Sequence, residues 1–454
     1  MCFQTFMNVN TVHTGKRASS LEVCDSGPKR RLPLLPKRLL FENISSLMAL
    51  QGLNYIIPLA TLPYLVRVLG IARFGQISVA QAFATYFVIF TDYGFNLSAT
   101  RTIARQHDDM TAVSATFSAV ITLKVIFMML GVGVMVLVLA VVPHFRADAS
   151  VYIVSYLAVV GSVLLPTWLF QGLQDMRTIA ILNGATKLAA ACLLFVFVHN
   201  PRDYVVAAAL PSVGMLVSGV VGLWICLGRV HLHYQFPEMQ HLREQLTEGF
   251  HLFVSTASIT LYTNTNVFLV GLLAGNVQAG YFSTGERVVR ATLGLLGPIF
   301  QGMFPHVNAI ARVSREQAIV FLRRSLLWIG PPSLLASLIL LFFAQPLVLL
   351  VFGREALGSV NVLRWIALLP FVVAISNVFG VQTMVTFGME KQFSRILIIA
   401  GAVNIVLCFL LVKGFGATGA AASVFTVEAG VTLAMGAFIW RLGVLDKNPR
   451  KVMA

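Results

Sequence analysis

Long apolar runs separated by short polar stretches dominate the chain between residues 43 and 440. A helix of about 20 mainly apolar residues is long enough to cross a bilayer. None of the runs alternates polar and apolar residues with period two, which excludes an outer-membrane barrel. We therefore predict an all-α polytopic membrane protein with about 12 transmembrane helices. The predicted spans are 43–66, 76–98, 113–141, 150–170, 179–198, 204–227, 250–274, 280–305, 317–343, 357–385, 394–412 and 417–440.

Composition supports a membrane protein and excludes a soluble enzyme. Of the 454 residues, 57% are hydrophobic and 11% are charged, and the mean hydropathy is +0.82. A soluble domain carries roughly 25% charged residues. The five cysteines form no CxxC pair, so the sequence indicates neither a metal site nor a disulfide framework.

The net charge of +15 indicates how the chain is oriented in the membrane rather than nucleic-acid binding, because the basic residues lie mainly between the apolar runs. With both termini in the cytosol, about 22 Lys and Arg residues fall on the cytosolic side and about six on the outer side. An odd number of spans would remove this asymmetry. We therefore expect an even number of spans and two cytosolic termini.

The polar stretches divide the chain into parts. Residues 1–40 are polar and basic and have no secretory h-region, which predicts a disordered cytosolic tail. A later translation start, at Met7 or Met48, is the alternative. The predicted parts are a tail at 1–40, an N-terminal six-helix lobe at 41–227, a cytosolic linker at 228–249, a C-terminal six-helix lobe at 250–440 and a tail at 441–454.

Three short segments of the first half resemble segments that lie six predicted spans later. Each similarity is weak, but the shared offset indicates a duplication. Both halves would begin in the cytosol, so the repeat is parallel, about an axis along the membrane normal. The paired segments are 74–78 with 279–283, 103–105 with 310–312, and 172–175 with 387–390.

The order of several motifs resembles a known family. The motif residues are Pro58, 62–70, Phe74-Gly75, 92–95, 166–172, Tyr262, Asn264, Asn266, 280–283, 416–422 and Glu428. Over about residues 40–440 the chain resembles the polysaccharide-transport family of the multidrug/oligosaccharidyl-lipid/polysaccharide (MOP) exporter superfamily, which includes O-antigen repeat-unit flippases.

The resemblance implies two six-helix lobes around a central cavity that opens alternately to each side of a bacterial inner membrane. It implies an undecaprenyl-diphosphate-linked oligosaccharide as substrate, moved from the cytosolic to the periplasmic leaflet before polymerisation. A polysaccharide polymerase and a chain-length regulator are then the expected partners, with membrane lipid and without nucleic acid.

Basic residues inside the spans are candidates for binding the diphosphate, because a buried anion needs fixed cations. They are Arg287, Arg290, Lys124 and Lys187. Glu286 lies four residues before Arg290, the favourable order for an ion pair. We expect Glu286 to neutralise Arg290 partly and to leave Arg287 freer for substrate. The alternative is a structural cluster that holds this helix to a neighbour.

Acidic and neutral polar residues supply the remaining candidates. Asp92, Glu428 and Glu286 are candidates for coupling transport to H⁺ or Na⁺, and counter-ion roles are the alternative. The possible sugar contacts are Gln81, Asn264, Asn266 and Tyr262, each of which is otherwise an inter-helix contact. We expect no catalytic residue, cofactor or bound metal.

Three other functions compete with a flippase. A multidrug exporter of the same superfamily would favour an acidic cavity, whereas basic residues prevail in these spans. An O-antigen polymerase or ligase would need sizeable outer loops, and the sequence has neither HExxH nor a P-loop. A peptidoglycan-precursor flippase fits the motifs and the span number less well. The sequence therefore favours a transporter over an enzyme.

Overall fold

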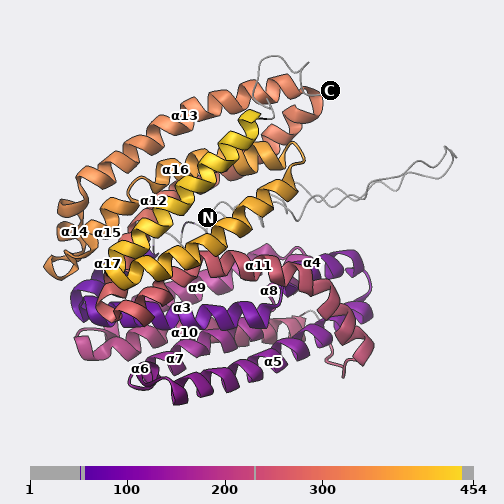
Figure 1. Cartoon of the computed structure of the whole chain (residues 1–454). Helices are drawn as coiled ribbons and strands as arrows, with labels where there is room; N and C mark the ends of the chain where they lie inside the picture. The colour runs from indigo at the N-terminus through magenta and orange to yellow at the C-terminus, as the bar shows by residue number, and fades with distance from the viewer. Residues whose placement is uncertain (1–51, 53–56, 230–231, 442–454) are drawn as a thin grey trace.

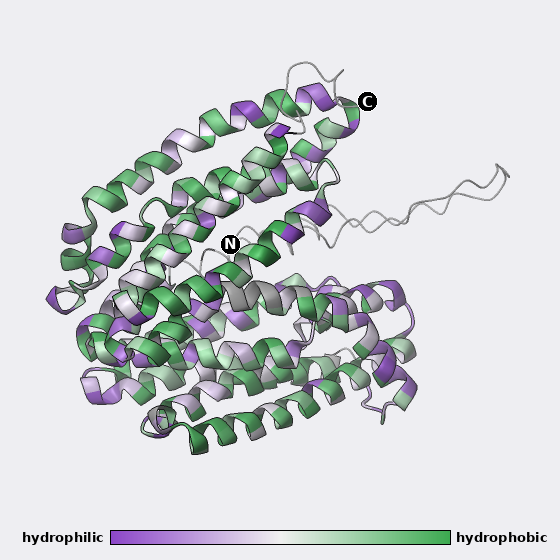
Figure 2. Cartoon of the chain, viewed as in Figure 1, coloured by the Kyte–Doolittle hydropathy of each residue, from purple (hydrophilic) through white to green (hydrophobic). Residues whose placement is uncertain are grey.

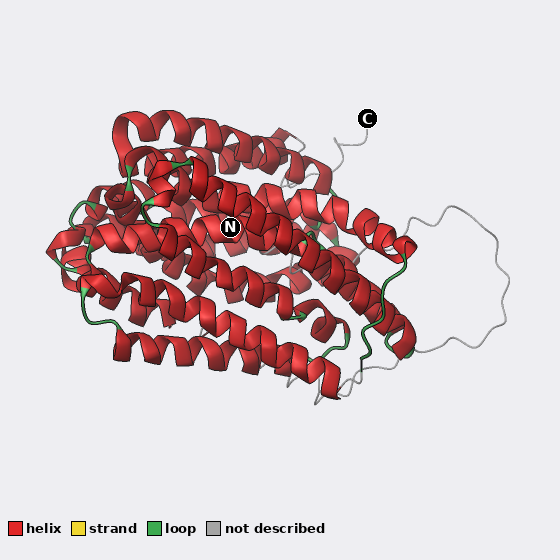
Figure 3. Ribbon diagram, turned by 90° about the horizontal axis from the view of Figure 1, so that it is seen from below, coloured by secondary structure: helices red, strands yellow, loops and turns green. Residues whose placement is uncertain are grey.

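The computed structural model describes residues 52, 57–229 and 232–441. Every regular element in this part is helical, and no strand occurs among these residues (Figure 3). Eight of the described helices are long and apolar enough to cross a membrane. Figure 2 shows hydrophobic residues along the helices, and α5 exposes large ones such as Leu130 and Leu137. The predicted all-α polytopic membrane fold is confirmed.

The helices lie close to the predicted spans, with breaks that the apolar pattern did not show. The first half contains the helix Ile57–Leu69, α3 (Ile71–Asp92), α4 (Phe95–Gln106), α5 (Met110–Val141), α6 (Pro143–Arg146), α7 (Ala149–Leu164), α8 (Thr167–Gly172), α9 (Met176–Phe197), η1 (Pro201–Asp203) and α10 (Tyr204–Arg229). The second half contains α11 (Met239–Ala274), α12 (Asn276–Val313), α13 (Arg315–Phe342), α14 (Ala344–Phe352), η2 (Arg354–Ala356), α15 (Ser359–Ile366), α16 (Leu369–Asn377), η3 (Val378–Val385) and α17 (Glu390–Arg441). Apart from Arg441, the predicted tails at 1–40 and 441–454 lie outside the described residues.

Backbone chemistry explains the breaks. Tyr93 and Gly94 have φ of 44° and 77°, a left-handed conformation that separates α3 from α4. Pro166 follows the end of α7, because proline disfavours the helical conformation of the preceding residue. In α17, Gly416 has φ of 56° and divides two helices that correspond to the last two predicted spans.

Two lobes converge at one end of the molecule and diverge at the other (Figure 1). The first lobe contains α3–α10, in indigo to magenta, and the second contains α13–α17, in orange to yellow, together with α12. At the converging end one hydrophobic core joins both lobes and includes Phe74, Phe282 and Leu363. At the diverging end the cores are separate: one surrounds Trp168 in the first lobe, and others surround Met435 and Phe300 in the second. The charge pattern of the loops predicts that the converging end faces outward.

The lobes approach most closely where α3 crosses α12. Both helices follow a glycine with positive φ, Gly70 at 77° and Gly275 at 86°. A Cβ atom added at Gly75 would collide with the carbonyl oxygen of Asn276 on α12. One added at Gly280 would collide with the carbonyl oxygen of Ile71 on α3. The contacts are reciprocal, as a two-fold relation between the duplicated halves requires.

Helix α11 connects the two lobes and begins inside the predicted linker 228–249. Near its start it packs on the first lobe, where the ring of Phe253 stacks on Tyr93 with centroids 4.8 Å apart. Near its end it reaches α17, where Asn404 Nδ2 donates to Asn266 Oδ1 at 3.0 Å. The predicted C-terminal lobe, 250–440, therefore shares its first helix with the N-terminal one.

The glycine crossing yields a stability prediction. Gly75→Ala forces α3 and α12 apart, because the added methyl group meets backbone rather than a flexible side chain. We expect a loss of about 2 kcal/mol in the free energy of unfolding, measured by thermal denaturation of the purified protein. Gly133→Ala on α5 is the matched control, since nothing lies within 4 Å of its added Cβ atom. Equal stabilities for the two variants would contradict a tight crossing.

Candidate functional site

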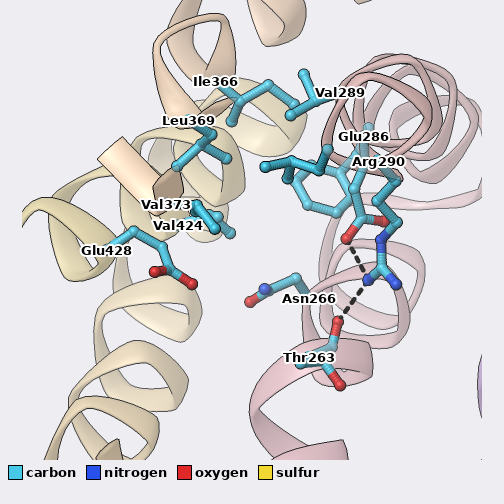
Figure 4. A pocket seen from close by; sticks show the side chains of 12 residues that line it. Thr263, Asn266, Glu286, Val289, Arg290, Ile366, Leu369, Val373, Val424 and Glu428 are labelled. Carbon is cyan, nitrogen blue, oxygen red and sulfur yellow. Dashed lines mark hydrogen bonds and ion pairs between the residues drawn. The ribbon is translucent and has the colours of Figure 1, made fainter. Parts of the chain in front are cut away.

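A small cavity of about 60 Å³, open on one side, lies between α11, α12, the α15–α16 segment and α17 (Figure 4). The wall formed by α15, α16 and α17 is apolar except for Glu428, and the wall formed by α11 and α12 carries Asn266, Glu286 and Arg290. The lining residues are Thr263, Asn266, Phe282, Glu286, Val289, Arg290, Leu293, Ile366, Leu369, Val373, Val424 and Glu428. The cavity belongs mainly to the second lobe, and α11 forms the wall nearest the first.

Helix α12 contributes an ion pair to this cavity. Arg290 Nη2 donates to Glu286 Oε1 at 2.7 Å, as the spacing of four residues predicts. The same nitrogen donates to the carbonyl oxygen of Thr263 at 2.9 Å. Arg290 is therefore held both by its own helix and by α11, and its charge is balanced locally.

A second carboxylate enters the cavity from the opposite wall. Glu428 on α17 is 8% exposed, and Figure 4 shows its carboxylate directed toward the cavity and Asn266. The carboxamide of Asn266 accepts from Asn404, whose own Oδ1 accepts from the Ser423 hydroxyl at 3.0 Å. Buried amides in such a network are fixed in position, because each polar atom that loses water needs a partner.

Arg287 points away from this cavity, toward the first lobe. Arg287 Nη2 donates to Gln81 Oε1 on α3 at 3.2 Å, and the guanidinium lies 5.0 Å from the centre of the Phe74 ring. Among the described residues no carboxylate forms an ion pair with it. Arg287 and Arg290, three residues apart, thus have different surroundings.

Asp92 and Lys124 form a separate pair inside the first lobe. Lys124 Nζ lies 3.2 Å from Asp92 Oδ1, and the two side chains are 3% and 15% exposed. The pair joins α5 to the end of α3, immediately before the break at Tyr93 and Gly94. In this conformation Lys124 presents almost no surface to a substrate.

The remaining candidates are dispersed. Lys187 is exposed on α9, apart from the cavity. Asn264 Nδ2 donates to the Thr263 hydroxyl at 3.2 Å. The side chain of Tyr262 lies outside the described residues. The structure thus brings Glu286, Arg290, Asn266 and Glu428 together, and the other candidates whose side chains it describes lie elsewhere.

The sequence analysis missed residues that shape the site. Thr263 supplies the carbonyl oxygen that binds Arg290, and Asn404 orients Asn266. Asn404 is a polar residue inside a predicted span, and this feature could have identified it as a candidate from the sequence. A backbone carbonyl carries no signal in the side-chain pattern.

Comparison with known proteins identifies the family. The family model described as "Polysaccharide biosynthesis protein" matches residues 40–311. A candidate O-antigen transporter of Escherichia coli (strain K12) is 34% identical over 397 residues, which cover 87% of this chain and 96% of that protein. The chain belongs to the polysaccharide biosynthesis protein family.

Solved structures show the same fold at low identity. The lipid II flippase MurJ in an inward closed conformation matches with a TM-score of 0.67 at 12% identity, over 89% of this chain and 88% of that one. An inward-facing multidrug resistance MATE family transporter of the MOP superfamily matches with a TM-score of 0.64 at 15% identity, over 86% and 96%. These structures confirm the two-lobe helical fold, and the family match confirms the resemblance to the polysaccharide-transport family.

The buried pair in the first lobe yields a second prediction. Lys124→Met leaves the Asp92 carboxylate buried without its partner, which costs about 3 kcal/mol of stability. The double variant Asp92→Asn/Lys124→Met removes both charges and recovers most of that loss. Thermal denaturation of the purified proteins measures both effects, and a double variant less stable than the single one would show that the pair is not coupled.

Proposed function

We propose that the protein is a flippase for undecaprenyl-diphosphate-linked oligosaccharide repeat units of O-antigen or another surface polysaccharide. It moves them from the cytosolic to the periplasmic leaflet of a bacterial inner membrane by alternating access. The family and the O-antigen transporter name of the E. coli relative support this proposal. The structural observation that carries it is the arrangement of cores, shared at one end and separate at the other. Two lobes joined at one end are suited to rocking about that end.

The substrate chemistry assigns roles to the polar residues. Sugar hydroxyls cannot enter hydrocarbon without hydrogen-bond partners, and the diphosphate needs cations. We assign the diphosphate to Arg287 first, because a guanidinium fork matches phosphate oxygens. The other proposed anion contacts are Arg290, Lys124 and Lys187, and the proposed sugar contacts are Gln81, Asn264, Asn266 and Tyr262.

Coupling to H⁺ or Na⁺ completes the proposal. Glu428 is the first candidate because its carboxylate enters the cavity opposite Glu286 and Arg290. Asp92 lies outside this cavity, paired with Lys124 inside the first lobe. Glu428→Gln is therefore expected to lose more gradient-driven transport than Asp92→Asn at equal protein level, measured in proteoliposomes with an imposed pH or Na⁺ gradient.

The proposal includes orientation and partners. Both termini lie in the cytosol, as the distribution of basic residues predicts, and a polymerase and a chain-length regulator act on the flipped product. No catalytic activity is part of the proposal. A multidrug exporter is the second candidate function, because a MATE family structure shares the fold.

Gene deletion with complementation tests the proposal. We expect deletion to abolish surface polysaccharide and to accumulate lipid-linked repeat units in the inner leaflet. The Arg287→Ala protein should restore display at least about tenfold less well than wild type, because it lacks the diphosphate contact. Arg290→Ala, whose charge is already balanced by Glu286, should have a smaller effect. Membrane protein levels, measured by immunoblot, provide the control.

Other outcomes would contradict specific parts. Intact polysaccharide with increased sensitivity to cationic drugs would identify a multidrug exporter. Equal effects of the two arginine variants would remove the distinction between Arg287 and Arg290.

A further inference from the structure

Two arginines of α12, Arg287 and Arg290, bind partners of different charge. Arg290 binds the carboxylate of Glu286 on its own helix, at 2.7 Å. Arg287 binds the neutral carboxamide of Gln81 on α3, at 3.2 Å. Arg290 therefore forms an ion pair with its partner, whereas Arg287 is oriented by its partner without forming an ion pair with it.

The duplication makes Gln81 and Glu286 equivalent positions. Gln81 lies six residues after Gly75, and Glu286 lies six residues after Gly280. The two glycines mark the reciprocal crossing of α3 and α12, so the axis that relates the lobes passes between them. The same place in the repeat therefore holds a carboxylate in one lobe and a carboxamide in the other.

We infer that Gln81 determines the charge selectivity of the site by keeping Arg287 uncompensated. The inference rests on the proposed function and specifies it further: the recognised group is the diphosphate of a lipid headgroup. A neutral amide oxygen yields readily to an anionic phosphate oxygen, because hydrogen bonds between charged groups are the stronger ones. A glutamate at the same position would hold the guanidinium itself and repel the incoming anion.

The surroundings of Arg287 fit this role. The Phe74 ring lies against the guanidinium and attracts its positive charge without cancelling it. Phe74 and Gln81 are both on α3, whereas Arg287 is on α12, so the pair spans the two lobes. Binding of an anion at Arg287 replaces an inter-lobe hydrogen bond by a contact with substrate. Gln81 thus sets the charge beside the group that binds the substrate, without holding it in an ion pair.

A direct binding measurement on the full-length protein in lipid nanodiscs tests this inference. The probe is geranylgeranyl diphosphate, with geranylgeraniol as the uncharged comparison. We expect Gln81→Glu to weaken diphosphate binding at least about tenfold, since it neutralises the cation that binds it. Gln81→Ala removes the hydrogen bond and adds no charge, and the probe carries no sugar for Gln81 to contact, so the affinity for this probe should stay within about threefold of wild type.

A matched control is available on the same helix. Gln76 on α3 also accepts from an arginine, with Arg73 Nη1 at 2.9 Å, and lies toward the outer end. Gln76→Glu introduces the same charge beside the same kind of group, outside the proposed site. We expect it to bind geranylgeranyl diphosphate like wild type, and thermal denaturation establishes that each variant is folded.

The outcomes separate this inference from the proposed function. Tight diphosphate binding by wild type and equally tight binding by Gln81→Glu would overturn the role of Gln81 and leave the flippase proposal standing. Equal losses for Gln81→Glu and Gln81→Ala would show that the hydrogen bond, and not the charge, matters, and would also overturn it. A wild-type protein that binds geranylgeraniol as well as the diphosphate would overturn the flippase proposal and this inference together.

Discussion

The close crossing of α3 and α12 is the constraint on which the arrangement of this protein depends. Backbone meets backbone at Gly75 and Gly280, so the two lobes touch there with no side chain between them. Helices approach this closely in membranes only where small residues allow it. The shared hydrophobic core surrounds the crossing, and the separate cores begin beyond it. The contact of Arg287 with Gln81 joins the same two helices beyond this point of approach.

Charge placement inside the membrane follows a simple physical rule. An isolated charge in a low-dielectric interior is costly, so Lys124 is paired with Asp92 and Arg290 with Glu286. Arg287 departs from the rule, because its partners are an amide and an aromatic ring. A site that binds a mobile anion needs a cation without a carboxylate partner, because a cation already held in an ion pair attracts a further anion less strongly.

Sequence reasoning succeeded where interactions are local. Apolar run lengths predicted the spans, and a spacing of four residues predicted the Glu286–Arg290 pair, because helix geometry alone brings such residues together. The contact of Arg287 with Gln81 joins residues far apart in the chain, so no spacing rule indicates it. The sequence raised a counter-ion role for Asp92 beside Lys124 but had no means of choosing it over ion coupling. The helical start of α11 was also missed, because its residues are polar and were assigned to a linker.

The path of α11 has a consequence for how the chain is made. Leu242 and Leu246 pack on the core of the first lobe, and Gly249 lies against Tyr93 at the break between α3 and α4. The diverging end of the first lobe therefore stays uncovered until α11 has left the ribosome. The first lobe completes its packing only when this helix arrives, so the two halves of the chain do not fold as fully independent units.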